Sequence, residues 1–357
     1  MDIRTFIRKD LRDMVNYQVQ PVRGIKMDAN ESPFPMSREL RGEIAKWIQE
    51  EETLRFYPDT DCVELRRTIA ETSGLSADQV LCGVGSDQII DFLMKTFLEE
   101  GDTILVPEPS FSMYALSAKI NHGKAVAFDL NAEDFSYPID TILQLCRERK
   151  PKILFLCTPN NPTGSPLERC ELERILEGVS CIVALDEAYG EFSGQNDLDL
   201  IETYPNLVSL RTFSKAFGLA GLRVGYALGS REMIQALDTV KAPYNLSTIA
   251  QITAAKVLRR PEYKEHIAWI LRERDRMYEQ LRQLEGKQGF YCYPSSANYF
   301  FMRSNVENLG ALLLERGLLV RAYTGSLKSY IRASITTQEG NDLFLASLWE
   351  ILEGIES

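Results

Sequence analysis

The chain has 357 residues, 45% of them hydrophobic and 25% charged, which suffices to bury a large core and to form one large domain plus a smaller one. Its formal net charge of −11, with no basic block, argues against a nucleic-acid surface. Only two histidines are present, so neither a histidine-based metal site nor a Ser-His-Asp triad is expected, and no metal is predicted.

Residues 1–24 predict a short amphipathic arm. The first ten positions carry charges throughout and lack an apolar signal core. No apolar run in the chain approaches the ~20 residues that span a bilayer. The seven cysteines form no CxxC pair, and several lie within apolar runs, which favours buried thiols in a reducing compartment. These features together predict a cytoplasmic protein without membrane contact.

Local signals place two early helices, and from residue 79 strand, turn and helix alternate. Ser37 is the expected N-cap of the first helix, and Asp61 with Glu64 predicts a capping box for the second. The alternation predicts an α/β fold with a doubly wound, mainly parallel sheet and helices on both faces. The predicted strands lie at 79–82, 103–106, 124–128, 152–157, 181–185, 207–211 and 224–228.

Beyond Pro243 the pattern changes to helices followed by short strands. Helices are expected at 247–258, 262–285, 306–316 and 337–353, and strands at 289–293, 298–303, 318–321 and 329–333. This composition predicts a smaller α+β domain, with the N-terminal arm packed against it. The expected division is a large domain of residues 36–260, with residues 1–35 and 261–357 forming the arm and the small domain.

One lysine stands in the most informative stretch of the chain, residues 211–226, which read Arg-Thr-Phe-Ser-Lys-Ala-Phe-Gly-Leu-Ala-Gly-Leu-Arg-Val-Gly-Tyr. Lys215 lies among apolar and small residues, and Arg223 follows eight positions later. Because desolvation and a nearby like charge both lower the pKa of an ammonium group, Lys215 is predicted to be partly neutral near pH 7. A neutral lysine amine can form a Schiff base with an aldehyde. The alternative is an ordinary surface lysine at a helix start.

Polar residues follow three of the predicted strands. Asp186 ends the strand in Cys-Ile-Val-Ala-Leu-Asp-Glu-Ala-Tyr (181–189), where it is placed to meet a cationic ring nitrogen, and a Pro/Asn turn follows the strand before it. Gly83–Asp87 follows another strand and opens a helix, so its backbone N–H groups can bind one phosphate together with Ser214 and Arg223. The full GxGxxG pattern is absent, which argues against nicotinamide binding. A strand-end cap and plain turns are the structural alternatives.

Three motifs follow one another in a characteristic order: Asn-Pro-x-Gly at 161–164, Asp-x-x-Tyr at 186–189 and Ser-Lys…Arg at 214–223. In this order they resemble the pyridoxal-phosphate aminotransferases of fold type I. Within that superfamily the chain most resembles the histidinol-phosphate aminotransferases, over nearly the whole span from Asn30 to Arg332.

The resemblance implies a cofactor, a reaction and an assembly. Pyridoxal 5'-phosphate would be bound by the large domain and held by Lys215 as an internal aldimine. The implied reaction is the transamination of histidinol phosphate, with 2-oxoglutarate and glutamate as the partner pair, in histidine biosynthesis. The enzyme would be a cytoplasmic homodimer with shared active sites.

The resemblance also implies roles for individual residues. Asp186 would keep the pyridine nitrogen protonated, Asn161 and Tyr189 would bond the ring hydroxyl oxygen, and Phe111 would stack on the ring. The catalytic set is Lys215, Asp186 and Tyr189. The cofactor-binding set comprises Gly85, Ser86, Asp87, Phe111, Asn161, Asp186, Tyr189, Thr212, Ser214, Lys215, Arg223 and the partner-facing Tyr57. The substrate-binding set comprises Arg332, Arg321, Tyr17 and Asn30.

Two departures from the subfamily leave other substrates open. Phe111 replaces a frequent tyrosine, and residues 333–337 lack the glycine that usually follows that strand. An aromatic amino acid aminotransferase or a threonine-phosphate decarboxylase of the same fold would share nearly every motif. A pyridoxal-phosphate-binding transcription regulator would need a helix-turn-helix domain ahead of Asn30, and too few residues precede it. A non-catalytic phosphate-binding module would not need Lys215 together with Asp186.

Overall fold

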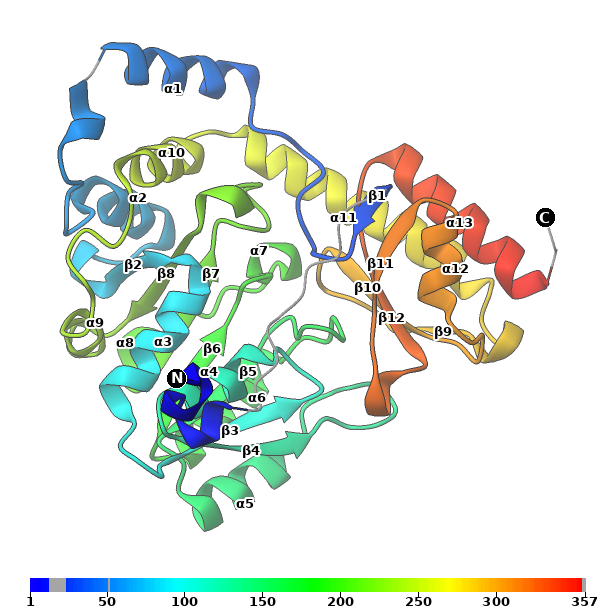
Figure 1. Ribbon diagram of the computed structural model, residues 1–357, viewed down its shortest axis with the longest axis horizontal. Coiled ribbons are helices and arrows are strands. Elements are labelled where there is room, and N and C mark those ends of the chain that lie inside the picture. Colours follow the sequence, from blue (N-terminus) through cyan, green and yellow to red (C-terminus); the bar gives the residue numbers. More distant parts are fainter. Residues whose placement is uncertain (13–23, 51, 355–357) are drawn as a thin grey trace.

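The computed structural model describes residues 1–12, 24–50 and 52–354, and these form two β-sheets with surrounding helices (Figure 1). The larger sheet has the strand order β2-β8-β7-β6-β5-β3-β4. Within it, only β8 runs antiparallel to its neighbours, so the predicted doubly wound, mainly parallel sheet is confirmed. Its strands are β2 (Val80–Val84), β3 (Thr103–Glu108), β4 (Lys124–Asp129), β5 (Ile153–Cys157), β6 (Ile182–Asp186), β7 (Leu207–Thr212) and β8 (Val224–Gly229).

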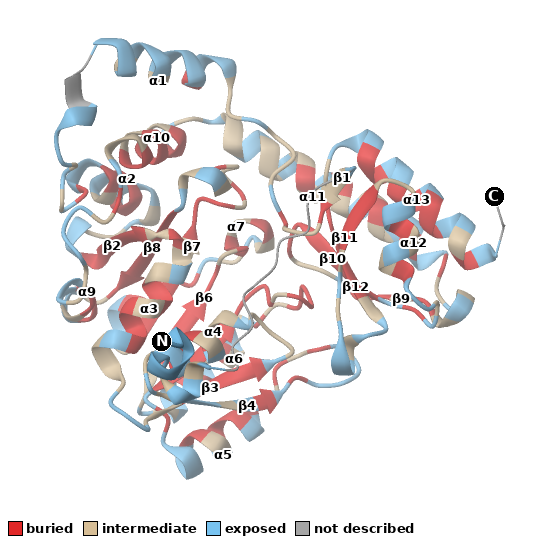
Figure 2. Cartoon of the chain, viewed as in Figure 1, coloured by how far each residue is buried: buried red, intermediate tan, exposed pale blue. Residues whose placement is uncertain are grey.

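Helices cover both faces of this sheet because its strands point apolar side chains alternately to either side. In β6, Val183 and Leu185 belong to one core and Ala184 to the other. The strands are accordingly buried along most of their length (Figure 2), except the edge strand β4, in which four of six residues are exposed. The first core includes α2 (Val63–Ser73), α5 (Ile139–Arg149), α6 (Arg169–Gly178) and α10 (Thr248–Leu258), and the second α3 (Gly85–Phe97), α4 (Met113–Ile120) and α9 (Arg231–Asp238). None of the helices in the described ranges is both long and apolar enough to cross a membrane.

The smaller sheet has the order β1-β11-β12-β10-β9 and packs against helices of the C-terminal part. Its strand β1 pairs in parallel with β11, so a segment near the N-terminus completes a sheet built from the C-terminal third. The strands are β1 (Ile25–Met27), β9 (Tyr291–Cys292), β10 (Tyr299–Arg303), β11 (Leu318–Ala322) and β12 (Tyr330–Ser334). The neighbouring helices are α11 (Glu262–Arg282), α12 (Leu309–Glu315) and α13 (Gln338–Glu353), and α7 (Gly190–Ser193) contributes Phe192 to the same core. The helices α1 (Arg38–Glu50) and α8 (Leu200–Thr203) pack on the core of the larger sheet.

The prediction that the whole arm packs against the small domain is wrong for its first residues. Residues 1–12 lie beside α4 of the large sheet, where Arg8 Nη1 donates to the carbonyl oxygen of Ile120 at 2.9 Å. Only the later part of the arm, β1, joins the smaller sheet. The exact division into residues 36–260 and residues 1–35 with 261–357 stays a proposal.

The two predicted helix starts differ in outcome. Ser37 Oγ accepts a hydrogen bond from the backbone N–H of Leu40, as an N-cap does. The predicted capping box at Asp61 is wrong, because α2 begins at Val63 and the carboxylate of Asp59 accepts its N–H at 2.8 Å. The helix is therefore capped from a residue two positions earlier than expected.

Candidate active site

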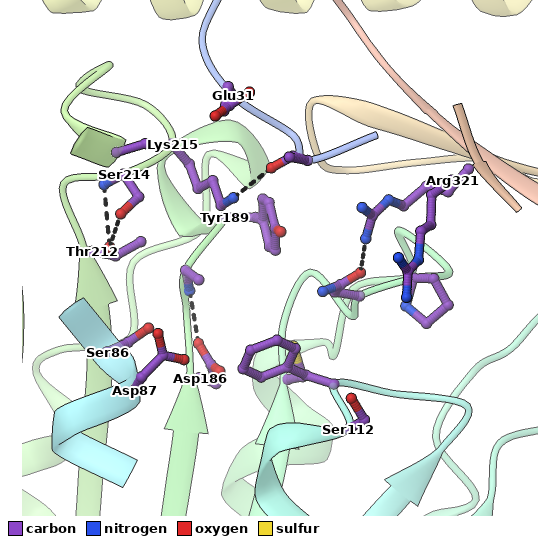
Figure 3. A pocket seen from close by; sticks show the side chains of 18 of the residues that line it. Glu31, Ser86, Asp87, Ser112, Asp186, Tyr189, Thr212, Ser214, Lys215 and Arg321 are labelled. Atoms are coloured by element: carbon purple, nitrogen blue, oxygen red, sulfur yellow. Dashed lines mark hydrogen bonds between the residues drawn. The ribbon is translucent and has the colours of Figure 1, made fainter. Parts of the chain in front are cut away.

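A cavity of about 490 Å³ lies where the C-terminal ends of the central strands face the smaller sheet (Figure 3). Asn161 follows β5, Asp186 ends β6 and Thr212 ends β7, while Arg321 and Arg332 reach the cavity from the other sheet. Parallel strands present their carboxyl ends at one edge, which is why these residues meet although they are far apart in the chain. The volume suits a cofactor together with a small substrate.

The amine of Lys215 is buried at the cavity wall in the loop after β7. Its Nζ donates a hydrogen bond to the backbone carbonyl of Ala29 at 2.8 Å and lies 5.8 Å from the centre of the Tyr189 ring. The pKa of Lys215 is lowered to about 8, mainly by burial and next by the charge of Arg332; the charge of Arg223 adds a smaller lowering, and Glu31 opposes it. The predicted lowering of the Lys215 pKa is therefore present, and the charge of Arg332 contributes more to it than the charge of Arg223 named in the prediction. A neutral amine is accessible near physiological pH.

The carboxylate of Asp186 lies at the end of β6 and is only 2% exposed. Its Oδ2 accepts a hydrogen bond from the hydroxyl of Tyr114 at 2.6 Å, and its Oδ1 accepts one from the N–H of Ala188 at 3.1 Å. Burial raises the pKa of Asp186 to about 6, and these two hydrogen bonds oppose the rise. The group is therefore mainly ionised at pH 7 and would gain from a cationic partner.

The N-terminus of α3 forms an anion-binding cup together with the start of β8. Gly85 has φ +71°, and a Cβ there would lie 2.6 Å from Nη2 of Arg223. A Cβ on Gly225 would lie 2.3 Å from the backbone of Gly85, so both positions require glycine. Arg223 is held by Asp87 at 2.9 Å and donates to Ser214 Oγ at 3.3 Å. Gly85 shapes this cup without lining the cavity itself, and the cup offers backbone N–H groups and a guanidinium to a phosphate.

Three ring-binding candidates surround the cavity. Phe111, Asn161 and Tyr189 all line it, as predicted, and burial raises the pKa of Tyr189 to about 12, so that its hydroxyl stays protonated. Asn30, expected at the substrate, does not line the cavity. Its amide instead donates to the hydroxyl of Tyr189 at 2.9 Å, and its Oδ1 accepts from Ser334.

Two arginines face each other across the antiparallel pair β11 and β12. Arg321 and Arg332 are register partners, so both side chains leave the same face of the sheet. Arg332 also donates to the carbonyl of Asp28 at 2.6 Å and to the amide oxygen of Asn161. Like charges directly opposite one another are unfavourable unless an anion lies between them. The guanidinium geometry of the pair suits a carboxylate or a phosphate, and its role as the substrate-anion site stays a prediction.

The other predicted site residues are placed as follows. Ser86, Asp87, Thr212, Ser214 and Arg223 line the cavity. Tyr57 does not, because its side chain is 81% exposed and stacks on Tyr244 with ring centres 4.5 Å apart. Tyr17 lies outside the described residues.

Several residues that line the cavity or lie directly behind its wall were missed by reasoning from the sequence. Glu31 directly follows Asn30, and Tyr323 lies two residues after Arg321, just beyond the end of β11, so both were close to residues already singled out. Tyr114, which bonds Asp186, gave no comparable signal, because it is one aromatic residue among apolar ones in a short helix.

The donor set fits pyridoxal phosphate. A lysine amine with a lowered pKa, a buried carboxylate and a cup of backbone N–H groups border one cavity. They match, in that order, the aldehyde, the ring nitrogen and the phosphate of the cofactor. A Cβ on either glycine of the cup would collide with Arg223 or with the backbone of Gly85, so the cup keeps this shape only with glycine at both positions.

Known proteins share both the sequence and the fold. The model of the family "aminotransferase class I and II" matches residues 22–348. A histidinol-phosphate aminotransferase of Ruminiclostridium cellulolyticum is 39% identical over 98% of this chain and 99% of its own length. The crystal structure of histidinol-phosphate aminotransferase from Sinorhizobium meliloti in complex with pyridoxal-5'-phosphate superposes with a TM-score of 0.84 and 22% identity, covering 94% of this chain and 92% of the other. L-threonine-O-3-phosphate decarboxylase from Porphyromonas gingivalis follows with a TM-score of 0.78 and 22% identity, over 92% and 99%.

Proposed function

Because this chain belongs to the class I and II aminotransferases, we propose that it transfers the amino group of histidinol phosphate to 2-oxoglutarate, as a step of histidine biosynthesis. The observation that carries the substrate is the 39% identity over nearly full length to a histidinol-phosphate aminotransferase. The decarboxylase and the aromatic aminotransferases are not favoured, since relatives that are 38–39% identical over 98% of this chain are histidinol-phosphate aminotransferases.

Pyridoxal phosphate, when bound, supplies an electrophilic aldehyde and a cationic ring that takes up the electron pair released at the substrate carbon. In this proposal the Nζ of Lys215 first holds the cofactor. Once released, its neutral amine would accept the proton from the substrate carbon that bears the amino group, and the resulting ammonium would pass that proton to the aldehyde carbon of the cofactor. With a pKa of about 8, part of the amine is neutral at pH 7 and can act as a general base. General base catalysis of this kind raises the reaction rate roughly 10²–10⁴-fold.

The other large-domain residues would bind and orient the cofactor. Asp186 holds the ring N–H as a charged hydrogen-bond partner. Asn161 and Tyr189 bond the ring hydroxyl oxygen, and Phe111 packs on the ring face. The phosphate would be held by the cup of Gly85, Ser86, Thr212, Ser214 and Arg223, and Asp87 would orient the guanidinium of Arg223, with which it pairs.

The arginine pair would serve both halves of the reaction. Histidinol phosphate has no α-carboxylate, so its phosphate would occupy the space between Arg321 and Arg332. A carboxylate of 2-oxoglutarate would use the same two guanidinium groups in the second half-reaction. Asn30 would act through Tyr189, whose hydroxyl it bonds, and Tyr17 stays a predicted neighbour of the imidazole.

The assembly in this proposal is a cytoplasmic homodimer. Tyr57 is 81% exposed, and its neighbours Leu54, Phe56 and Val63 are more than half exposed. Such an apolar surface is unusual for a monomer and is typical of an interface. A second copy that covered it would receive Tyr57 near its cofactor phosphate. All seven cysteines are free, as suits a reducing compartment.

The test of the substrate is a comparison of kcat/KM for histidinol phosphate, phenylalanine and threonine phosphate with the same purified enzyme. Release of carbon dioxide is measured with threonine phosphate. We expect histidinol phosphate to be preferred and no carbon dioxide to be released. A preference of about tenfold or more for phenylalanine, or decarboxylation, would overturn the substrate and leave the family assignment intact.

A further inference from the structure

Tyr114 makes the shortest contact to Asp186. It lies in α4, is 1% exposed, and its hydroxyl donates to Oδ2 of Asp186 at 2.6 Å. Its ring stacks on Phe155 with centres 4.6 Å apart and meets the edge of Phe111 at 5.6 Å. The ring is thus held by packing on two sides, and its hydroxyl has a fixed position under the carboxylate.

The surroundings of Asp186 otherwise disfavour its charge. Asp87 on α3 and the adjacent Glu187 are both acidic, and burial removes water from the carboxylate. Against these, Tyr114 and the N–H of Ala188 each donate to one oxygen. Burial and the charge of Asp186 raise the pKa of Tyr114 well above its ordinary value, so the phenol remains a donor at any physiological pH.

We propose that Tyr114 is a positioning residue for cofactor binding: its hydroxyl fixes the orientation of the Asp186 carboxylate and keeps it ionised toward the ring nitrogen. This inference rests on the proposed function, because it takes Asp186 as the partner of the cofactor ring. Tyr114 does not line the cavity and acts entirely through Asp186.

The test compares Tyr114→Phe with Tyr137→Phe by titrating pyridoxal phosphate into cofactor-free protein and measuring its dissociation constant. Tyr137 is a matched control, since it is 3% exposed and its hydroxyl donates to the carbonyl oxygen of Cys157 at 2.7 Å. Hydrogen bonds to charged groups suggest a loss of roughly 10- to 150-fold for Tyr114→Phe, against less than about threefold for Tyr137→Phe. Melting temperatures of the two variants report any shared loss of packing.

Two further arms separate positioning from structure. Inorganic phosphate would use the cup and not Asp186. Its dissociation constant, obtained from competition with the cofactor, should therefore be the same in wild type and in Tyr114→Phe. In an Asp186→Asn background, Tyr114→Phe should change cofactor affinity by less than about threefold, because the group through which it acts is gone.

Three results would overturn the inference: wild-type affinity in Tyr114→Phe, an equal loss in the Asp186→Asn background, or an equal loss of phosphate binding. Each of them leaves the proposed function standing as long as the wild type binds pyridoxal phosphate. A wild type that does not bind it at all would refute the proposed function instead.

Discussion

Replacing Arg332 should impair the enzyme in two separable ways. Its guanidinium faces the cavity opposite Arg321 and bonds Asp28 and Asn161. If it holds the substrate anion, its loss removes a charge-assisted hydrogen bond that contributes roughly 1.5–3 kcal/mol. The expected fall in kcat/KM is about 10- to 150-fold in both half-reactions for Arg332→Gln.

The second effect acts on Lys215. After burial, the charge of Arg332 is the largest influence that lowers the pKa of Lys215 to about 8. Removing that charge therefore raises the pKa of the amine. Below the pKa, each unit of increase reduces the neutral fraction about tenfold, which corresponds to about 1.4 kcal/mol.

Arg332→Lys distinguishes the two effects, because it keeps the charge and loses the bidentate fork. Single-turnover rates with histidinol phosphate and with 2-oxoglutarate report the anion contact, and the pH dependence of cofactor uptake by cofactor-free protein reports Lys215. Arg332→Gln should move the uptake profile to higher pH, whereas Arg332→Lys should leave it near that of wild type. Arg321→Gln should reduce the rate with the phosphorylated substrate more than the rate with 2-oxoglutarate.

An unchanged pH profile in Arg332→Gln would refute the coupling between the two side chains. Full activity of Arg332→Gln with both substrates would refute the anion site. The pH profile of cofactor uptake is measured without an amino donor, so the first result does not depend on the donor's identity.

Three other predictions follow from the same contacts. The purified enzyme should be yellow, and mass spectrometry after borohydride reduction should place the cofactor adduct on Lys215; an adduct on a different lysine contradicts the site. Hybrids formed by mixing Tyr57→Phe and Lys215→Ala chains should regain activity, because one of their sites receives both intact residues; inactivity after proven subunit exchange would mean that Tyr57 acts within its own chain. Burial raises the pKa of Glu191 to about 7 from 4.5, and its Oε2 has no hydrogen-bond partner among the described residues. Because the folded state favours the protonated Glu191, the fold has its full stability below pH 4.5 and loses part of it as the pH rises through 7. The unfolding free energy of the wild type should therefore fall by about 1–3 kcal/mol relative to that of Glu191→Gln over this interval. Parallel pH profiles of the two unfolding free energies would contradict this.

The sequence by itself determined the strands of the larger sheet, their mainly parallel arrangement and the polar residues at their ends, whereas β1 of the smaller sheet was not predicted. The bounds of each strand in the larger sheet were predicted to within a few residues, because a buried parallel strand is a short apolar run that ends in a polar turn. Asp186 and Asn161 stand at or just after the ends of such strands. Because parallel strands end at one edge of a sheet, both residues were expected at one ligand crevice, and both line the cavity. Lys215 was found for a related reason, since its apolar neighbours already implied desolvation.

Only the tertiary structure decided which distant groups touch these residues. The carbonyl of Ala29 meets Lys215 across 186 positions, Arg332 meets Asn161 across 171, and Tyr114 meets Asp186 across 72. Periodicity and motif spacing describe neighbours along the chain, and they carry no information on contacts that depend on how two sheets pack. For the same reason the packing of the first arm residues was predicted wrongly, and the effect of the Arg332 charge on the Lys215 pKa was not predicted. Both depend on contacts between segments that are far apart in the sequence.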